Sequence, residues 1–231
     1  GVSVDRASKT LARQIKEIAA DALEAAADDL EIADGSVRVA GTDRTISFAD
    51  LAAHPRATPD KLRAVEEFSV EPPTFPNGTH IAEVEIDADT GATSIERYVV
   101  VDDFGATLNP LLLEGQVHGG VVQGIGQALM ENTVYDSTSG QLLSASFMDY
   151  AMPRAEHAPY FVFETRNVPC KTNPLGVKGA GEAGAIGSCP AVINAIVDAL
   201  WRSHRIRHID MPATPQRIWQ AIENARKTQA S

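Results

Sequence analysis

Residues 175–200 read LGVKGAGEAGAIGSCPAVINAIVDAL and place a glycine-rich loop directly before an apolar run. Five glycines surround a single acid, Glu182, and from Ala191 onward apolar residues recur at steps of three and four, which predicts a helix. Glycines allow a backbone to approach a bulky ligand, and a helix N-terminus directs free N–H groups at an anion. We expect this loop to be the functional centre, with Glu182 acting on whatever binds there.

Size, charge and composition indicate a globular protein and exclude several kinds of partner and metal site. The chain has 231 residues, 44% of them hydrophobic and 22% charged, which is typical of a globular protein. A net charge of −11 argues against a nucleic-acid partner, because phosphate binding needs a basic face. Two cysteines are too few for an iron–sulfur cluster or a cysteine-rich zinc site, and their scarcity fits a reducing cytoplasm.

Targeting signals are not expected in this chain. No apolar run is predicted to approach the ~18 residues of a membrane span, and no signal peptide precedes the first helix. The sequence begins with Gly1 and not with Met. We therefore expect either a processed start or a part of a longer polypeptide.

Periodicity and turn residues predict helices and strands in mixed order. The expected helices cover residues 4–28, 49–53, 110–131 and 215–226, and the expected strands cover 30–33, 37–40, 45–48, 80–87, 93–101 and 161–166. Prolines make residues 55–76 loop-rich, which predicts an N-terminal region over 1–76 and a cofactor-binding region over 77–231. The order predicts an α+β fold in which helices pack on mixed sheets.

The glycine loop also matches a nucleotide-binding fingerprint. Residues 179–184 read GAGEAG and satisfy G-x-G-x-x-G. That fingerprint requires a hydrophobic strand running straight into the first glycine, whereas Pro169 and Pro174 interrupt the approach here. A nicotinamide-dinucleotide-binding dehydrogenase domain is accordingly the third interpretation.

The predicted helix over residues 110–131 is unusually rich in glycine. Each helical glycine costs about 0.8–1 kcal/mol relative to alanine, so something must pack closely against this helix. We expect Gly124 and Gly126 to serve helix packing, and Gln116 and Gln123 to point into a polar cleft. His118 stands without a second ligand at metal spacing, which favours a hydrogen-bonded structural role. For Glu182, the structural alternative is an acid stabilised by the helix dipole, worth ~0.3–1 kcal/mol.

Two motifs together carry a family resemblance. Residues 103–110 read DFGATLNP and are followed by GQVHG at 115–119 and VQGIG at 122–126, while residues 178–182 read KGAGE. In this order and at this distance they resemble the molybdopterin-binding large subunit of the molybdenum hydroxylases, a family that includes xanthine dehydrogenase, aldehyde oxidase and aerobic carbon monoxide dehydrogenase. The similarity covers most of residues 30–226 and corresponds to the C-terminal part of that subunit. The resemblance therefore implies that the chain is either a fragment or one subunit of a split enzyme.

The resemblance implies roles for individual residues. Glu182 is the expected general base, which takes the proton from a hydroxyl ligand of molybdenum whose oxygen attacks the substrate carbon. Gln116 is expected to hydrogen-bond the pterin cofactor. Further positions expected to bind the cofactor are Lys178, Gly179, Ala180 and Gly181. No side chain is expected to ligate the metal, because the pterin dithiolene holds it.

The resemblance also implies cofactors and partners. The expected cofactor is molybdopterin with molybdenum, as the cytosine dinucleotide, bound only together with the earlier half of the large subunit. Iron–sulfur (2Fe-2S) and FAD centres are expected on partner subunits or domains, in the cytoplasm. The substrate is a small molecule (an aldehyde, an N-heterocycle or carbon monoxide), and the chain alone is expected to be inactive. The alternative is a non-catalytic assembly module of the same fold.

Overall fold

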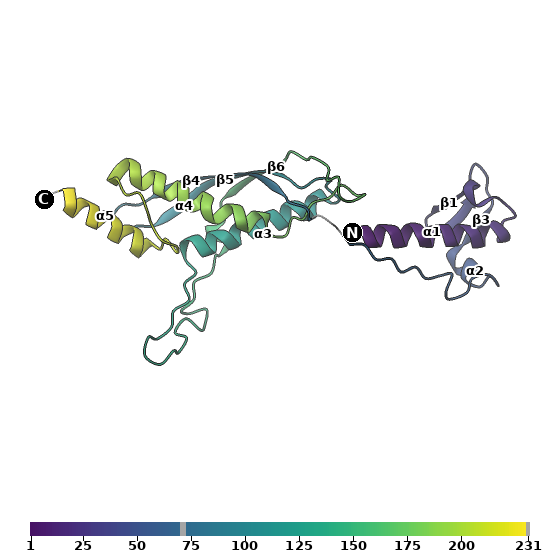
Figure 1. Cartoon of the computed structure of the whole chain (residues 1–231), viewed down its shortest axis with the longest axis horizontal. Helices are drawn as coiled ribbons and strands as arrows, with labels where there is room; N and C mark the ends of the chain where they lie inside the picture. Colours follow the sequence, from purple (N-terminus) through teal and green to yellow (C-terminus); the bar gives the residue numbers. More distant parts are fainter. Residues whose placement is uncertain (70–72, 230–231) are drawn as a thin grey trace. The chain divides into compact units, whose positions relative to one another are not determined.

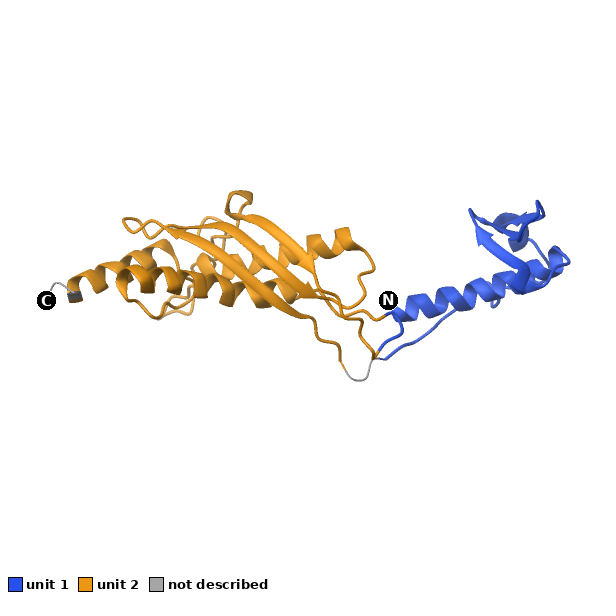
Figure 2. Cartoon of the chain, turned by 90° about the horizontal axis from the view of Figure 1, so that it is seen from above, with its two compact units in different colours: residues 1–72, 173–175 blue, residues 73–172, 176–231 orange. Residues whose placement is uncertain are grey.

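The computed structural model describes residues 1–69 and 73–229, which divide into two compact units (Figure 2). Unit 1 comprises residues 1–72 and 173–175, and unit 2 comprises residues 73–172 and 176–231. Each unit has a hydrophobic core of its own. The division predicted after residue 76 stays a prediction, because compactness does not show that either part folds alone.

Unit 1 consists of a long helix and a small antiparallel sheet. Its elements are α1 (Val2–Ala22), the 3₁₀ turn η1 (Ala27–Asp29), β1 (Leu30–Ala33), β2 (Ser36–Val39), β3 (Thr45–Ser47) and α2 (Phe48–Ala52). The strands pair in the order β1-β2-β3. The strands predicted over 30–33 and 37–40 are confirmed as an antiparallel pair, and Ser47 caps α2 by accepting a hydrogen bond from the Asp50 amide.

Helix α1 ends earlier than its apolar periodicity suggests. It ends at Ala22 instead of residue 28, since Leu23 leaves the helical conformation and Glu24 has a φ of 43°. Leu23 is thereby buried in the core of unit 1 beside Leu30. Core packing decides the end of this helix, and the polar residues at 28 and 29 only form the following 3₁₀ turn.

Unit 2 is built on a mixed three-stranded sheet. Strand β4 (Asn77–Ile86) is antiparallel to β5 (Thr93–Asp103), which is parallel to β6 (Tyr160–Thr165). The helices are α3 (Pro110–Leu129), η2 (Ala155–His157), α4 (Ala183–His204) and α5 (Pro215–Gln229). Figure 1 shows α3 and α4 running together along one side of the sheet. Helices on mixed sheets confirm the predicted α+β class.

Small residues allow α3 and α4 to approach closely. A Cβ atom added at Gly124 would overlap the Ser188 hydroxyl of α4, and one at Gly184 would lie 2.5 Å from the Val117 carbonyl oxygen. Gly126 meets Pro153 instead of a helix, at 2.6 Å from its Cγ. The packing role predicted for Gly124 is therefore confirmed, whereas Gly126 accommodates a loop.

Helix α4 is long and apolar enough to cross a membrane by length and composition alone, the one such helix in the described residues. This corrects the expectation that no stretch approaches that length. Val192, Ile196 and Leu200 of α4 are buried in the core of unit 2, together with residues of α3 and β5. Core helices of soluble proteins pass the same test, and packing within unit 2 buries this one side of α4.

Candidate active site

Glu182 stands at the very start of α4. It is the N-cap residue, and its carbonyl oxygen accepts the first helical hydrogen bond from the Ile186 amide at 2.9 Å. Its side chain is exposed, and among residues 1–69 and 73–229 no hydrogen bond or ion pair engages its carboxylate. The carboxylate is thus available to a group outside this chain.

Gln116 joins the two sequence motifs. Its Nε2 amide donates to the Gly181 carbonyl oxygen at 3.3 Å, across a sequence separation of 65 residues. Gly181 directly precedes Glu182, so the contact brings the exposed face of α3 to the glycine loop. The predicted site residues Gln116 and Glu182 therefore lie next to each other in the fold.

An ion pair fixes the loop to the end of β5. The Lys178 ammonium donates to Asp103 Oδ2 at 2.6 Å, and both side chains are nearly buried. Burial raises the pKa of Asp103, but hydrogen bonds from Lys178 and from the Val168 and Gly105 amides outweigh it and hold the pKa at about 2. The ammonium group of Lys178 is thus engaged within the chain. Sequence reasoning missed this pair because its members lie 75 residues apart.

The glycines around Glu182 leave open space. A Cβ atom added at Gly179 or Gly181 in the loop, or at Gly115 or Gly119 in α3, would meet nothing within 4 Å. Ala180 between the two loop glycines instead packs its methyl group against the core of unit 2. The backbone at these four glycines is therefore not covered by side chains, which allows a bulky group to approach it closely beside the Gln116 amide. This uncovered surface beside Glu182 is called the recess below.

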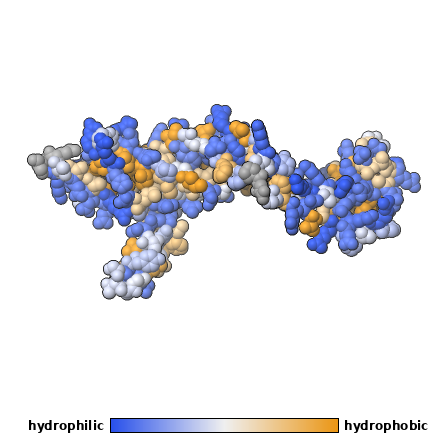
Figure 3. Space-filling view, in the orientation of Figure 1, coloured by the Kyte–Doolittle hydropathy of each residue, from blue (hydrophilic) through white to orange (hydrophobic). Residues whose placement is uncertain are grey.

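Large apolar side chains are exposed just before and at the start of α3 and in the first turn of α4. Leu108, Leu111 and Leu112 at the start of α3 are 67%, 77% and 70% exposed, and Ile186 in the first turn of α4 is 69% exposed. Figure 3 shows such hydrophobic areas interrupting the polar surface of unit 2. Clustered apolar exposure of this kind marks surfaces that bind something.

The structure shows how His118 packs, while the cleft role of Gln123 stays a prediction. The His118 ring stacks on Phe161 with centroids 4.4 Å apart, and its buried Nε2 has no hydrogen-bond partner. The structural role is as predicted, but stacking and not hydrogen bonding provides it. Gln123 is exposed, and within the described residues no cluster of side chains could hold a metal ion.

A buried polar cluster under α4 escaped sequence reasoning. His80 of β4 shares a hydrogen bond of 2.9 Å with the Tyr98 hydroxyl and lies 3.4 Å from Asp102 Oδ2. Burial, together with the negative charge of Asp102, raises the pKa of Tyr98. His80 reads in the sequence as one polar residue of an alternating strand, so no local signal reveals the cluster.

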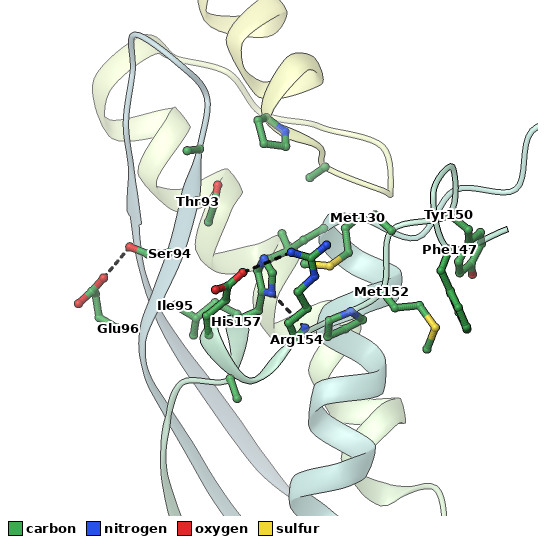
Figure 4. Close-up of a pocket in the computed structure, with 18 residues that line it drawn as sticks. Thr93, Ser94, Ile95, Glu96, Met130, Phe147, Tyr150, Met152, Arg154 and His157 are labelled. Atoms are coloured by element: carbon green, nitrogen blue, oxygen red, sulfur yellow. Dashed lines mark hydrogen bonds and ion pairs between the residues drawn. The ribbon is translucent and has the colours of Figure 1, made fainter. Parts of the chain in front are cut away.

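The large cavity of unit 2 lies elsewhere (Figure 4). It measures about 950 Å³, and its lining includes Ile95, Met130, Met152, Arg154 and His157. Met130 follows the C-terminal end of α3, about 20 Å from Gln116 at 1.5 Å per residue. None of the predicted site residues lines this cavity, so it is separate from the recess at Glu182.

Comparison with known proteins decides the family. Residues 1–159 match the model of the molybdopterin cofactor-binding domain, which is more than half of the chain. The chain belongs to this family. The resemblance found in the sequence is thereby confirmed at the level of the molybdopterin-binding family.

Individual relatives of this molybdopterin-binding chain support the same family. It is 35% identical over 163 residues to the carbon monoxide dehydrogenase large chain of Hydrogenophaga pseudoflava, covering 70% of this chain and 20% of the relative. It is 35% identical over 193 residues to the nicotine 6-hydroxylase large subunit of Paenarthrobacter nicotinovorans, covering 80% and 23%. The crystal structure of quinoline 2-oxidoreductase from Pseudomonas putida 86 superposes with a TM-score of 0.77 at 36% identity, covering 94% and 29%. The chain thus spans less than a third of these relatives.

The fold leaves the nicotinamide interpretation without structural support. Strand β6 ends at Thr165, well before Gly179, and between them residue 177 forms only an isolated bridge with Gly105. A dinucleotide fingerprint requires a strand that leads straight into its first glycine. The glycines of this molybdopterin-binding chain therefore serve a different kind of loop.

Proposed function

We propose that this chain is the C-terminal part of the large subunit of a molybdenum hydroxylase, with Glu182 as its general base. The hydrogen bond from Gln116 to Gly181 carries the proposal, because it brings the Gln116 side chain to the residue that directly precedes Glu182. The recess beside them is free of side chains at four glycine positions. A base needs an unengaged carboxylate within reach of the reacting proton, and Glu182 meets the first condition.

Some residues of the chain bind the cofactor, and one transfers a proton. When bound, the molybdenum–pterin group supplies the two-electron redox chemistry. Gln116 hydrogen-bonds the pterin with its side-chain amide, while the backbone of residues 178–181 lines the recess. An oxygen of the Glu182 carboxylate accepts the proton of the water-derived nucleophile and later releases it to solvent. Lys178 contributes by holding the loop to Asp103.

The remaining parts of the enzyme lie outside this chain. We propose that the cofactor is the cytosine dinucleotide form and that the earlier half of the large subunit closes the recess. Iron–sulfur (2Fe-2S) and FAD centres on partner subunits or domains accept the electrons, in the cytoplasm. The substrate is a small molecule from the range that the names of the relatives span: carbon monoxide, N-heterocycles such as nicotine and quinoline, or aldehydes.

Glu182→Gln in the assembled enzyme tests the proposed base. The amide keeps the size of the side chain but cannot accept the proton, so turnover should fall at least a thousand-fold while molybdenum and pterin contents stay normal. Glu223→Gln on α5 is the matched control and should keep full turnover. Wild-type turnover in Glu182→Gln would contradict the proposal and favour the non-catalytic assembly module.

The open recess leads to a prediction for the chain by itself. Glu182 and the glycines beside it face space that other residues of the chain leave open. We expect the purified chain to hold less than ~0.1 molybdenum per molecule and to show no turnover, because one wall does not retain the cofactor. Elemental analysis after desalting measures this directly, with the assembled enzyme as the positive control. Stoichiometric molybdenum on the chain alone would contradict the one-wall arrangement.

A further inference from the structure

The cluster of His80, Tyr98 and Asp102 lies deep in unit 2 and takes no part in the proton transfer proposed for Glu182. The side chains of His80 and Asp102 are 7% and 4% exposed, and Tyr98 is completely buried. Polar groups at such depth cost stability unless they are bonded to one another. His80 provides that bonding, because one of its ring nitrogens faces the Tyr98 hydroxyl and the other faces the Asp102 carboxylate.

Two glycines allow the backbone to pass close to the side chains of this cluster. A Cβ atom added at Gly187 in α4 would lie 2.5 Å from Cε1 and Nδ1 of His80, and one at Gly78 in β4 would overlap the Asp102 carboxylate. The His80 ring therefore touches the backbone of α4 directly. Because the ring is held at both nitrogens, it acts as a fixed support for the beginning of the helix.

The supported turn leads straight to Glu182. The Glu182 carbonyl oxygen accepts from the Ile186 amide at 2.9 Å, and Gly187 is the next residue. A cavity of about 150 Å³ lies beside the support and is lined by His80, Asp102, Ala183, Ile186 and Gly187, among others. This cavity gives the first turn of α4 room to move as soon as the support is lost.

Consecutive acids at the end of β5 anchor the loop and the helix on either side of Glu182. Successive side chains of a strand point to opposite faces. Asp102 accordingly holds His80 beneath α4, while Asp103 holds Lys178 before the glycines. The backbone of Glu182 is thus fixed from both directions, although its carboxylate is not engaged.

We propose that His80 is a positioning residue for Glu182: held between the Tyr98 hydroxyl and the Asp102 carboxylate, it supports the first turns of α4 at Gly187 and so sets the direction of the Glu182 carboxylate. The catalytic half of this inference rests on the function proposed above. The mechanical half concerns this chain alone and can be tested without cofactor.

Amide hydrogen exchange on the chain tests the support. His80→Leu removes both ring nitrogens. Tyr98→Phe removes only the hydroxyl that holds Nδ1 of His80, and this milder variant provides the test if His80→Leu does not fold. We expect the amides of residues 186–189 to exchange at least ten-fold faster in both variants, with residues 192–200 unchanged. Tyr150→Phe, which removes a hydroxyl that donates to Glu131 at 2.7 Å, is the matched control and should change neither segment. Unchanged exchange at 186–189 in both variants would overturn the proposal.

The assembled enzyme tests the effect on Glu182. In His80→Leu, kcat per bound molybdenum should fall about ten-fold with KM within two-fold of wild type, and His80→Gln, which keeps one hydrogen bond, should recover part of that loss. A kcat per molybdenum in His80→Leu equal to that of Tyr150→Phe would overturn the proposal. If Glu182→Gln remained active, the proposed function would fail while the exchange result still stood. If exchange were unchanged and Glu182→Gln inactive, only the positioning role of His80 would fail.

Discussion

At the scale of single residues, the site combines a carboxylate that is free with neighbours that are tightly held. Lys178 and Asp103 share a nearly buried ion pair, and Gln116 is bonded to the loop carbonyl. Among these side chains, only that of Glu182 makes no hydrogen bond or ion pair within the described residues. This contrast is what a general base requires, because a fixed frame orients a group whose lone pairs remain available.

The Asp103–Lys178 pair makes the stability of unit 2 depend on pH in the acid range. The folded-state pKa of Asp103, about 2, lies below the ordinary value of 3.8. The stabilisation is therefore complete above that ordinary value and disappears as the pH falls toward 2. We expect Asp103→Asn to cost on the order of 1–2 kcal/mol at pH 7 and to flatten the stability profile between these two limits.

Urea denaturation at several pH values measures this effect. Asp89→Asn, which removes a carboxylate from an exposed turn, is the control and should follow the wild-type profile. An Asp103→Asn profile as steep as that of the wild type between pH 4 and 2 would show that the ion pair does not stabilise the fold.

At the scale of elements, four of the five glycines of α3 fall into two groups that sequence alone does not separate, and the fifth, Gly126, meets Pro153. Gly120 and Gly124 face α4, and Gly115 and Gly119 face open space. The sequence predicts only that something packs closely on this helix. Which glycine meets the neighbouring helix depends on how α3 is rotated, and that rotation is set by burial of Val117, Val121 and Ile125.

Matched alanine substitutions separate packing glycines from open ones. In Gly119→Ala the new methyl meets nothing within 4 Å, so the purified chain should gain about 0.8–1 kcal/mol of unfolding free energy from higher helix propensity. In Gly184→Ala the methyl would lie 2.5 Å from the Val117 carbonyl oxygen and 2.7 Å from the Val121 nitrogen, so about 1–3 kcal/mol should be lost to overpacking.

Chemical denaturation of the two variants gives both free energies on one scale. In the assembled enzyme, Gly119→Ala should lower the molybdenum content although it stabilises the chain, because its methyl group enters the proposed cofactor recess. A destabilised Gly119→Ala chain would contradict the open recess. A Gly184→Ala chain as stable as wild type would contradict close packing of α3 on α4.

Helices and strands were predicted well where neighbouring residues supply the signal, either a residue that caps a helix or an alternation of apolar and polar residues along a strand. Asn109 caps α3 by accepting from the Leu112 amide at 3.1 Å, as its position before Pro110 predicts. Long-range partners were not predictable in this way. Asp103 finds Lys178 and His80 finds Asp102 only after the sheet has formed, so neither pair leaves a periodic pattern in the sequence. The helical pattern pointed to Gln116 as a cleft residue, and the resemblance to the family assigned it to the pterin.

At the scale of the whole molecule, the fold separates the candidate site from a second core. Unit 1 packs around Ile18, Leu30, Val37 and Leu51, and none of these residues belongs to the core cluster of unit 2. The site residues 103, 116 and 178–182 all belong to unit 2. A loss of packing in unit 1 should therefore leave the frame around Glu182 intact.

Two matched core substitutions test this separation. Leu30 in unit 1 and Leu200 in unit 2 are 1% and 2% exposed, so truncating either to alanine should cost about 2–5 kcal/mol. Both tryptophans of the chain, Trp201 and Trp219, lie in unit 2, and their fluorescence therefore reports that unit alone. We expect Leu30→Ala to lower the thermal midpoint seen by far-ultraviolet circular dichroism but not the one seen by tryptophan fluorescence. Leu200→Ala should lower both, and an equal shift of the fluorescence midpoint in the two variants would show that the cores unfold as one.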